Sequence, residues 1–265
     1  NQKVVITFHG ADIQKDINIR YGYRFDQKYE NLLKKTLKIV DKVYAISDTI
    51  INELVLLNYP KDKIVKIPNS VELKKFQECK ILKKDKETVK FITVARYYEK
   101  KKGLDLIEQV SKYLIEKKIN FKWTLVGRDS SNLLKKDFII KNKNFFEILK
   151  EIPNDDEIYF PHSKLIKIYK SHDAYINLAR IESFGITLLE AIAAGLPVIS
   201  FDTKGANELI INNENGILVN EYNPLKMAEL IIEKIKDNYF DKEIKNTKIE
   251  KYDLEFNSIL TQNNY

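Results

Sequence analysis

The chain has 265 residues, of which 44% are hydrophobic and 31% charged, and its formal net charge is +7. That length suits one large domain or about two, and the composition is that of a globular protein with buried cores. The longest apolar run, Leu188–Ile199, is interrupted by Glu190, Gly195 and Pro197, so it falls short of the roughly 20 residues of a membrane span. A single cysteine, Cys79, excludes an internal disulfide and favours a reducing, cytoplasmic location.

The positive charge comes from many scattered lysines, with local clusters at 83–86 and 100–102. A basic chain can bind nucleic acid, an anionic membrane surface or phosphorylated small molecules, although most surface lysines only serve solubility. Neither zinc-finger spacing nor an aromatic RNA-binding signature accompanies the charge, so nucleic acid is not an expected partner. Peripheral association with the inner face of an anionic membrane is a further hypothesis.

The first part of the chain alternates between short apolar runs and polar or helical segments. Strands are predicted at three β-branched or apolar runs that end at turn signals: 3–8, 42–46 and 64–67. Ser47 and Asp48 can cap a helix over 49–57. Alternating strands and helices predict parallel pairing with crossover helices.

Between 71 and 87 the composition shifts to Lys, Glu and Gln, which is typical of an interdomain connection with few contacts. A denser pattern follows, with strands predicted at 89–95, 122–126, 174–178, 198–201 and 216–219. Helices are predicted at 103–117, 163–171, 184–194 and 225–237, and a closing helix near the C-terminus. This α/β pattern indicates a doubly wound sheet with both faces covered. The predicted domains are 1–77 and 78–247, followed by a closing helix at 248–265.

The segment from Arg180 to Asn220 contains the best-marked helix of the chain. Ser183 is a candidate N-cap, and Gly195 stands where a glycine ends a helix. The free N–H groups at such a helix start favour a bound anion, and a carboxylate is a natural acceptor for the hydroxyls of a sugar. Glu190 lies among apolar residues, where an acid is costly to bury without partners. The alternative is that Glu190 occupies a narrow exposed stripe.

A second candidate group follows the strand at 89–95. Arg96, the lysines at 100–102 and Gly103 come at the edge of the sheet where ligands of open α/β folds bind, so they can clamp a diphosphate. Solvated surface lysines are the alternative. His9 follows the first strand and is a candidate acid or base, although a lone loop histidine is more often structural.

Several other chemistries lack their motifs in this sequence. The three histidines and the one cysteine show no metal-ligand spacing, and no Asp-x-Asp pair is present to hold a divalent cation on a sugar diphosphate. The nucleophile elbow of hydrolases and the Walker loop of P-loop kinases and nucleoside triphosphatases are absent as well. We therefore expect no metal and no cofactor, and neither hydrolase nor kinase activity.

The segment ESFGITLLEAIAAGLPVIS at 182–200, followed by GANE at 205–208 and NGILV at 215–219, resembles the signature of group 1 glycosyltransferases. These are retaining enzymes of the GT-B fold. Upstream segments agree in order along the chain: TFHGAD at 7–12, VYAISDTI at 43–50, KIVKIPNSVELKKF at 63–76, TVAR at 93–96, KKGLDLI at 101–107 and TLVG at 124–127.

The resemblance implies two Rossmann-like domains facing a cleft, with a nucleotide sugar bound by the C-terminal one. It implies that Glu190 holds the ribose, that Glu182 holds the donor sugar, and that Arg96 and Lys102 neutralise the leaving diphosphate. His9 lies across the cleft in this reading and completes the catalytic set. The remaining donor-binding residues that it implies are Gly127, His162, Ser183, Phe184, Gly185, Ile186 and Thr187, with the base contacted near Gly127 and 159–163.

The sequence departs from the family pattern in two places. The family's lysine usually follows the arginine by six positions or fewer, and three lysines compete here; Lys102 is the choice because it precedes Gly103. Only about 75 residues precede the connection, roughly half of an ordinary Rossmann-like domain. The family's first strand and glycine-rich loop are not found, so the N-terminal, acceptor-side domain is expected to be truncated.

The leading hypothesis is a retaining, metal-independent hexosyltransferase. It would move a sugar from a nucleoside-diphosphate sugar to a glycan or lipid-linked acceptor in the synthesis of cell-surface polysaccharide or glycolipid. The alternatives are a non-catalytic sugar-nucleotide-binding subunit or remnant, and an epimerase or phosphorylase on the same fold.

Overall fold

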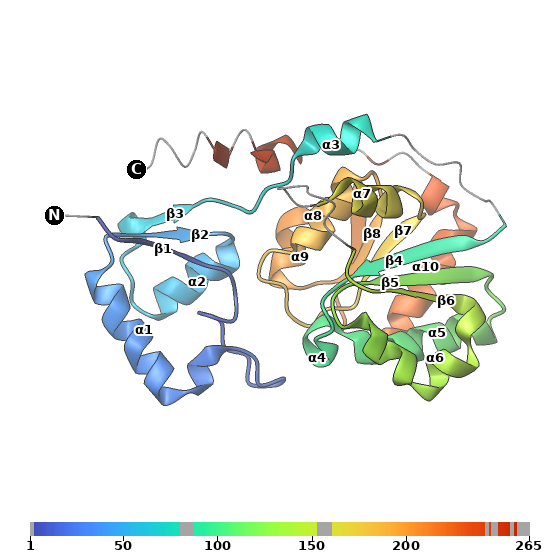
Figure 1. Cartoon of the computed structure of the whole chain (residues 1–265), viewed down its shortest axis with the longest axis horizontal. Coiled ribbons are helices and arrows are strands. Elements are labelled where there is room, and N and C mark those ends of the chain that lie inside the picture. Colours follow the sequence, from blue (N-terminus) through green and yellow to red (C-terminus); the bar gives the residue numbers. More distant parts are fainter. Residues whose placement is uncertain are drawn as a thin grey trace.

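The protein consists of two parallel β-sheets that lie side by side (Figure 1). The computed structural model describes residues 3–79, 87–152, 161–241, 244, 249–254, 257 and 258. The first sheet has the strand order β1-β2-β3, and the second has the order β6-β5-β4-β7-β8-β9. All paired strands of both sheets are parallel, which confirms the expected α/β architecture with crossover helices.

The first sheet and its helices form the first unit of the molecule. Its strands are β1 (Val5–Phe8), β2 (Lys42–Ala45) and β3 (Ile64–Lys66), and its helices are α1 (Gln27–Ile39) and α2 (Asp48–Leu56). The three predicted strands are confirmed. Ser47 caps α2 as expected, because its hydroxyl accepts from the backbone N–H of Ile50 at 3.3 Å.

The stretch expected to be an interdomain connection lies between the strands of the first sheet and those of the second, and it contains a helix, α3 (Leu73–Glu78), so only the expectation of few contacts was wrong. Leu73 and Phe76 are buried, and α3 packs against helix α7 (Ser163–Lys170) of the second unit. The Lys170 ammonium donates to the carbonyl of Cys79 at 2.9 Å. Two apolar residues three positions apart were enough to anchor a helix that is polar elsewhere. Residues 80–86, with the predicted lysine cluster at 83–86, lie outside the described residues.

The second unit carries the six-stranded sheet. Its strands are β4 (Val89–Val94), β5 (Phe121–Val126), β6 (Phe146–Leu149), β7 (Ala174–Asn177), β8 (Val198–Phe201) and β9 (Gly216–Val219). Its other helices are α4 (Glu99–Lys102), α5 (Ile107–Glu116), α6 (Asp137–Lys141), α8 (Ile186–Ala193), α9 (Lys204–Leu209) and α10 (Pro224–Lys236). The sequence prediction missed β6, α4, α6 and α9.

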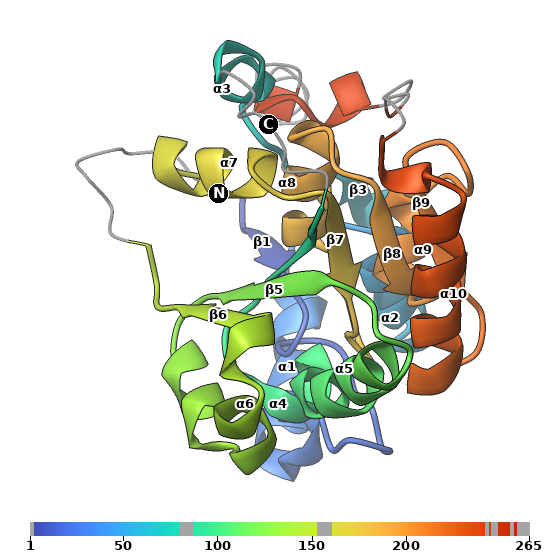
Figure 2. The ribbon, with the colours of Figure 1, turned by 90° about the vertical axis from the view of Figure 1, so that its right-hand side faces the viewer.

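Helices cover both faces of the six-stranded sheet. Figure 2 shows α5 and α10 on one side and α7 and α8 on the other. One apolar core joins α5 and α10 to strand residues such as Phe91 and Trp123, whereas the other joins α7 and α8 to Ile92 and Val94. Neighbouring residues of β4 thus face opposite cores, which confirms the predicted doubly wound arrangement.

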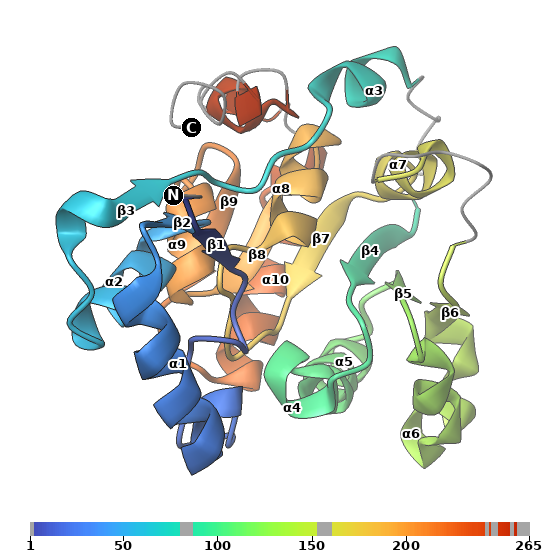
Figure 3. The same cartoon turned by 60° about the vertical axis from the view of Figure 1, so that its left-hand side comes forward.

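The C-terminal segment returns to the first half of the chain (Figure 3). Ile249–Tyr252 is a 3-10 helix, and the carbonyl of Tyr252 accepts from the N–H of Val71 at 3.0 Å. Most of the predicted closing helix at 248–265 falls outside the described residues. No helix within the described part of the chain is long and apolar enough to cross a membrane.

Polar contacts across the interface hold the two units together. Glu208 of α9 accepts from the N–H of Asp48 at 2.8 Å, so a carboxylate of the second unit lies at the start of α2. Lys66 pairs with Glu208 at 3.0 Å and with Asp48 at 2.7 Å. A carboxylate at a helix N-terminus is favoured both by the free N–H groups and by the helix dipole.

Candidate active site

The candidate site lies where the order of the six-stranded sheet reverses. β4 pairs with β5 on one side and with β7 on the other, so the loops after β4 and β7 leave the same edge of the sheet next to each other. In open α/β sheets this edge is the usual position of a ligand. The loop after β4 carries Arg96, and the loop after β7 carries Glu182.

A close approach at Gly103 brings these two loops together. Gly103 has φ = 67°, and a Cβ atom there would lie only 1.8 Å from the carbonyl oxygen of Leu178. Only glycine tolerates both the left-handed backbone and this contact. The neighbouring N–H of Arg180 donates to the carbonyl of Lys101 at 2.9 Å. The short helix α4 is therefore held against the end of β7.

Lys102 and Glu182 form an ion pair at this point. The Lys102 Nζ atom lies 2.5 Å from Glu182 Oε1, and the side chains are 20% and 7% exposed. These residues are 80 positions apart in the chain. Removing one partner of a largely buried pair leaves the other charge without compensation, which is strongly unfavourable. The two residues predicted to act together at the donor are thus in direct contact.

The start of α8 differs from the prediction. Ser183 is not the N-cap; that position belongs to Gly185, whose φ is 94°. The Ser183 hydroxyl instead donates to Gln14 Oε1 of the first unit at 2.5 Å. The loop after β1 approaches so closely that a Cβ atom on Gly10 would lie 2.4 Å from Ser183 Oγ. The serine is used to join the units, and a glycine with positive φ makes the turn into the helix.

Glu190 lies inside the protein rather than on an exposed stripe. Its side chain is 5% exposed, and its Oε2 atom accepts a hydrogen bond from the Tyr169 hydroxyl at 2.7 Å. Burial raises the pKa of Glu190 to about 7, although the hydrogen bond from Tyr169 opposes that shift. The carboxyl group therefore changes charge near neutral pH.

The other residues around α8 fall into different environments. Phe184 is 2% exposed and packs edge-to-face on Tyr252, with ring centroids 5.6 Å apart, so its side chain belongs to the core. Ile186 is partly exposed at the first turn of α8. The Thr187 hydroxyl accepts from the hydroxyl of Tyr175 at 2.9 Å. The Phe184 side chain therefore cannot contact a ligand, and the predicted role of this segment depends on its backbone N–H groups.

Three predicted residues lie on other segments. His9 is exposed at the end of β1, where the N–H groups of His9 and Gly10 donate to the Asp12 carboxylate at 2.9 and 2.7 Å. Gly127 follows β5, and a Cβ atom there would lie 2.1 Å from the carbonyl oxygen of Ala95.

His162 is buried directly before α7, with 2% of its surface exposed. Of the stretch 159–163 near which we expect the base to be contacted, 159 and 160 lie outside the described residues.

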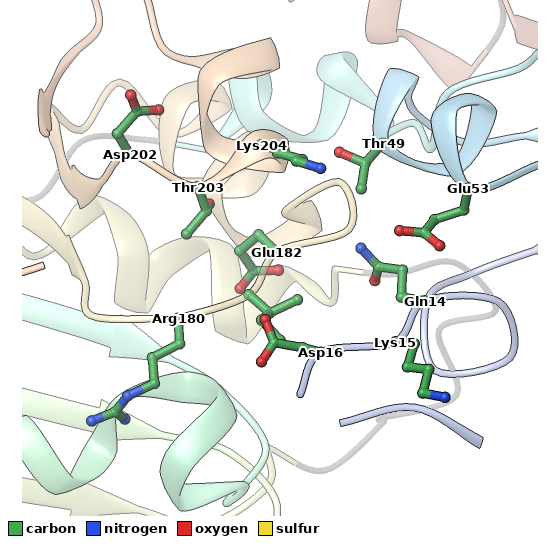
Figure 4. A pocket seen from close by; sticks show the side chains of 11 residues that line it. Gln14, Lys15, Asp16, Thr49, Glu53, Arg180, Glu182, Asp202, Thr203 and Lys204 are labelled. Atoms are coloured by element: carbon green, nitrogen blue, oxygen red, sulfur yellow. The ribbon is translucent and has the colours of Figure 1, made fainter. Parts of the chain in front are cut away.

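The two members of the Lys102–Glu182 pair line two different cavities. The first, which we call the mixed-charge cavity, has a volume of about 250 Å³ and contains Glu182. Side chains of both units face each other in it (Figure 4). The lining residues are Gln14, Lys15, Asp16, Thr49, Glu53, Arg180, Ile181, Glu182, Asp202, Thr203 and Lys204. Apart from Glu182, none of these was a predicted site residue, because isolated polar residues on separate loops carry no spacing signal.

The second, which we call the cationic cavity, has a volume of about 420 Å³ and contains Lys102. It lies between the loop after β1 and the segment around α4. Its lining residues are Ala11, Arg20, Tyr21, Gly22, Tyr23, Arg96, Tyr98, Lys101 and Lys102. Arg96 and Lys102, the two residues predicted to neutralise the diphosphate, both line this cavity, whereas Arg20, Tyr21 and Lys101 were not among the predicted site residues.

No group of three His, Cys, Asp or Glu side chains in the described part of the chain could hold a metal ion.

Comparisons with known proteins agree with this geometry. Residues 74–252 match the family described as glycosyl transferases group 1, and residues 1–75 match glycosyltransferase family 4. N-acetyl-alpha-D-glucosaminyl L-malate synthase of Bacillus anthracis is 26% identical over 243 residues, which cover 89% of this chain and 59% of that protein. The chain thus spans less than two thirds of this relative.

Solved structures show the same fold at low sequence identity. HepE from Anabaena, crystallised with UDP-glucose, has a TM-score of 0.76 and 15% identity, covering 99% of this chain and 72% of that one. The pneumococcal O-GlcNAc transferase, crystallised with UDP and GlcNAc, has a TM-score of 0.69 and 18% identity, covering 98% and 52%. The fold is of the GT-B type. The family match covers more than half of the sequence, and the chain therefore belongs to the group 1 glycosyltransferases.

Proposed function

We propose that the protein is a retaining glycosyltransferase that moves a hexose-type sugar from a nucleoside-diphosphate sugar to a glycan or lipid-linked acceptor. The observation that carries the proposal is the Lys102–Glu182 pair, whose members line the two cavities, with Arg96 lining the cationic one. This arrangement sets two cations beside a carboxylate at the ligand-binding edge of the sheet. The cations can bind the negatively charged diphosphate, and the carboxylate can accept a hydrogen bond from a sugar hydroxyl.

In the proposed reaction, the bond between the anomeric carbon and the diphosphate oxygen breaks. Arg96 and Lys102 stabilise the negative charge that develops on the leaving diphosphate, which is the main contribution to catalysis. The acceptor hydroxyl attacks from the same face, and the leaving phosphate takes its proton. The products are a glycoside of retained configuration and a nucleoside diphosphate, and the protein supplies no nucleophile.

Glu190 is assigned to the ribose of the donor. Its carboxyl group is buried and already accepts from Tyr169, so one oxygen remains for a ligand hydroxyl. The Glu182 carboxylate takes the donor sugar in this assignment. His9 is assigned to the opposite wall, beside the reacting carbon.

The relatives differ in what their names specify. They include a sucrose-phosphate synthase of Thermosipho melanesiensis and a poly(glycerol-phosphate) alpha-glucosyltransferase of Bacillus subtilis. We therefore propose a uridine diphosphate donor from the neighbouring structures, and we leave the acceptor at the level of a glycan or lipid-linked molecule. A cytoplasmic location with peripheral attachment to the inner membrane face and a role in polysaccharide synthesis belong to the same proposal.

The test is a binding screen followed by product analysis. Purified protein is titrated with UDP, GDP and ADP, and the tightest nucleotide is then supplied as its sugar conjugates with candidate acceptors. The proposal expects one nucleotide sugar to be consumed, a new glycosidic bond, and loss of both binding and transfer in Glu190→Ala. Transfer that is unchanged in Glu190→Ala would contradict it. Binding without any transfer would identify a binding subunit, and isomerised donor would identify an epimerase.

A further inference from the structure

The cationic cavity carries more positive charge than a donor diphosphate requires. Four of its nine lining residues are Arg or Lys, and none is Asp or Glu. Lys102 is compensated by Glu182. Among the described residues, no carboxylate forms an ion pair with the other three, Arg20, Arg96 and Lys101. Like charges in one cavity repel each other, so this arrangement favours an anionic ligand.

Lys101 is fixed in position by aromatic side chains of the cavity wall. Its Nζ atom donates to the Tyr21 hydroxyl at 2.7 Å and lies 4.2 Å from the centre of the same ring. The ring of Tyr21 is itself held edge-on by Tyr98, with centroids 6.3 Å apart. An ammonium group has three N–H donors, and only one of those of Lys101 has an acceptor among the described residues. Two donors remain for a ligand.

Arg20 is presented by a tight hairpin of the first unit. Asp16 and Tyr21 exchange backbone hydrogen bonds at 2.9 Å in both directions, and Arg20 between them has φ = 51°. That conformation is uncommon for a residue other than glycine, asparagine or aspartate. Directly after the hairpin, a Cβ atom on Gly22 would lie 1.9 Å from the carbonyl of Gln14, so the loop is packed closely and its position is well defined.

The rim of the cavity is aromatic and accessible. Tyr23 is 60% exposed and Tyr98 is 52% exposed, and they line the same space as the cations. Exposed tyrosine rings offer apolar faces together with a hydroxyl, which suits a ligand that has both polar and carbon surfaces. The lining of the cavity therefore suits an organic anion better than a simple inorganic ion.

We propose that Arg20 and Lys101 form a subsite for an anionic group, a phosphate ester or a carboxylate, that the acceptor carries near its attacking hydroxyl. This rests on the proposed function, because Arg96 and Lys102 are taken to serve the donor diphosphate. The anion is assigned to the acceptor because Arg20 belongs to the unit opposite the donor site. Arg20 comes from the first unit and Lys101 from the second, so a ligand bound by both would lie between the two units.

The test uses three small probes that share a three-carbon polyol skeleton and carry a phosphate ester, a carboxylate or no anionic group. The protein saturated with UDP is titrated by calorimetry with sn-glycerol 3-phosphate, with glycerate and with glycerol. We expect at least one anionic probe to bind and glycerol not to bind. Arg20→Gln and Lys101→Gln should each weaken that binding by about 10- to 100-fold, the usual range for one charge-assisted hydrogen bond. Comparing the phosphate and carboxylate probes identifies the anion.

Two controls separate this subsite from the donor site. Lys100→Gln removes an exposed lysine of the same helix that does not line the cavity, and it should leave probe binding unchanged. UDP affinity should change by less than about twofold in Arg20→Gln, whose side chain is exposed and whose replacement should not unfold the protein.

The proposal is overturned if no anionic probe binds better than glycerol, or if Arg20→Gln weakens UDP as much as the probe. Failure of the unaltered protein to bind UDP contradicts the proposed function instead. If UDP does not bind, the probes are titrated without it. Binding of an anionic probe that is lost in Arg20→Gln then supports the subsite, and failure of both anionic probes to bind refutes it.

Discussion

The two glutamates of the 182–190 segment are almost equally buried but lie in opposite electrostatic surroundings. Glu182, at the cleft between the units, is 7% exposed and paired with the ammonium of Lys102. Glu190, about one turn along α8 in the interior, is 5% exposed and accepts a hydrogen bond from the neutral hydroxyl of Tyr169. A cation offsets the desolvation of a carboxylate, whereas a phenol does so only in part. The two glutamates therefore differ in the charge of the side chain that bonds to them, and not in how deeply they are buried.

The largest effect is expected from removing the cation at the cleft. Lys102→Ala should lower the rate of sugar transfer by about 100- to 1000-fold, the range found when one stabilising group at a developing negative charge is lost. Steady-state kinetics with the identified donor measure it. Lys100→Ala is the control, because this lysine lies on the same helix and is exposed. Equal rates of sugar transfer in Lys102→Ala and Lys100→Ala would show that Lys102 takes no part in the reaction.

The interior carboxyl group should make stability depend on pH. The folded-state pKa of Glu190 is about 7 against an ordinary value of 4.5, so the folded protein binds more protons than the unfolded chain between those values. The free energy of unfolding should therefore fall as pH rises from 4.5 to 7, by on the order of 3 kcal/mol. Urea midpoints measured across this range test it. In Glu190→Gln, the free energy of unfolding should no longer fall by this amount over this pH range. A pH dependence that is the same in Glu190→Gln as in the unaltered protein would show that Glu190 is not the group that titrates.

Removing the phenol would sharpen the contrast between the two regions. Tyr169→Phe takes away the donor to Glu190, and we expect about 1 to 3 kcal/mol of lost stability at pH 8, where the carboxylate is charged. The loss should be smaller at pH 5, where Glu190 is protonated. Tyr175→Phe is the matched control, because that hydroxyl bonds to the neutral Thr187 hydroxyl and Val94 carbonyl. Its effect should be the same at both pH values.

The smallest effect is expected at the contact next to Glu182. Ser183→Ala removes the hydrogen bond to Gln14 and should cost about 0.5 to 1.5 kcal/mol. Faster amide hydrogen exchange in the loop at 10–14 would show that the bond holds the first unit against α8. Ser200→Ala, inside the six-stranded sheet, should leave that loop unchanged. Unaltered exchange in both variants would mean that the close packing at Gly10 suffices by itself.

The fold was accessible from sequence wherever an element carried its own pattern. The strands at 89–95 and 198–201 are mostly apolar runs rich in β-branched residues, and Ser47 supplied a local cap, so these predictions were confirmed. β6 was missed because Phe146–Leu149 is short and includes a glutamate, and α3 was missed because only Leu73 and Phe76 of its six residues are apolar and buried. Tertiary packing, rather than local preference, stabilises such elements.

The sequence by itself determined the family, the alternating architecture and the order of Arg96, Lys102, Glu182 and Glu190 along the chain. Among the three lysines at 100–102 it favoured Lys102 only by its place before Gly103, and it predicted Ser183 as a helix cap. The tertiary structure showed that Lys102 meets Glu182, Lys101 meets Tyr21 and Ser183 meets Gln14. The physical reason is the distance along the sequence over which each interaction acts. Caps and periodicity involve residues a few positions apart. The partners of these three side chains lie 80 or more positions away, and the packing of the two units brings them into contact.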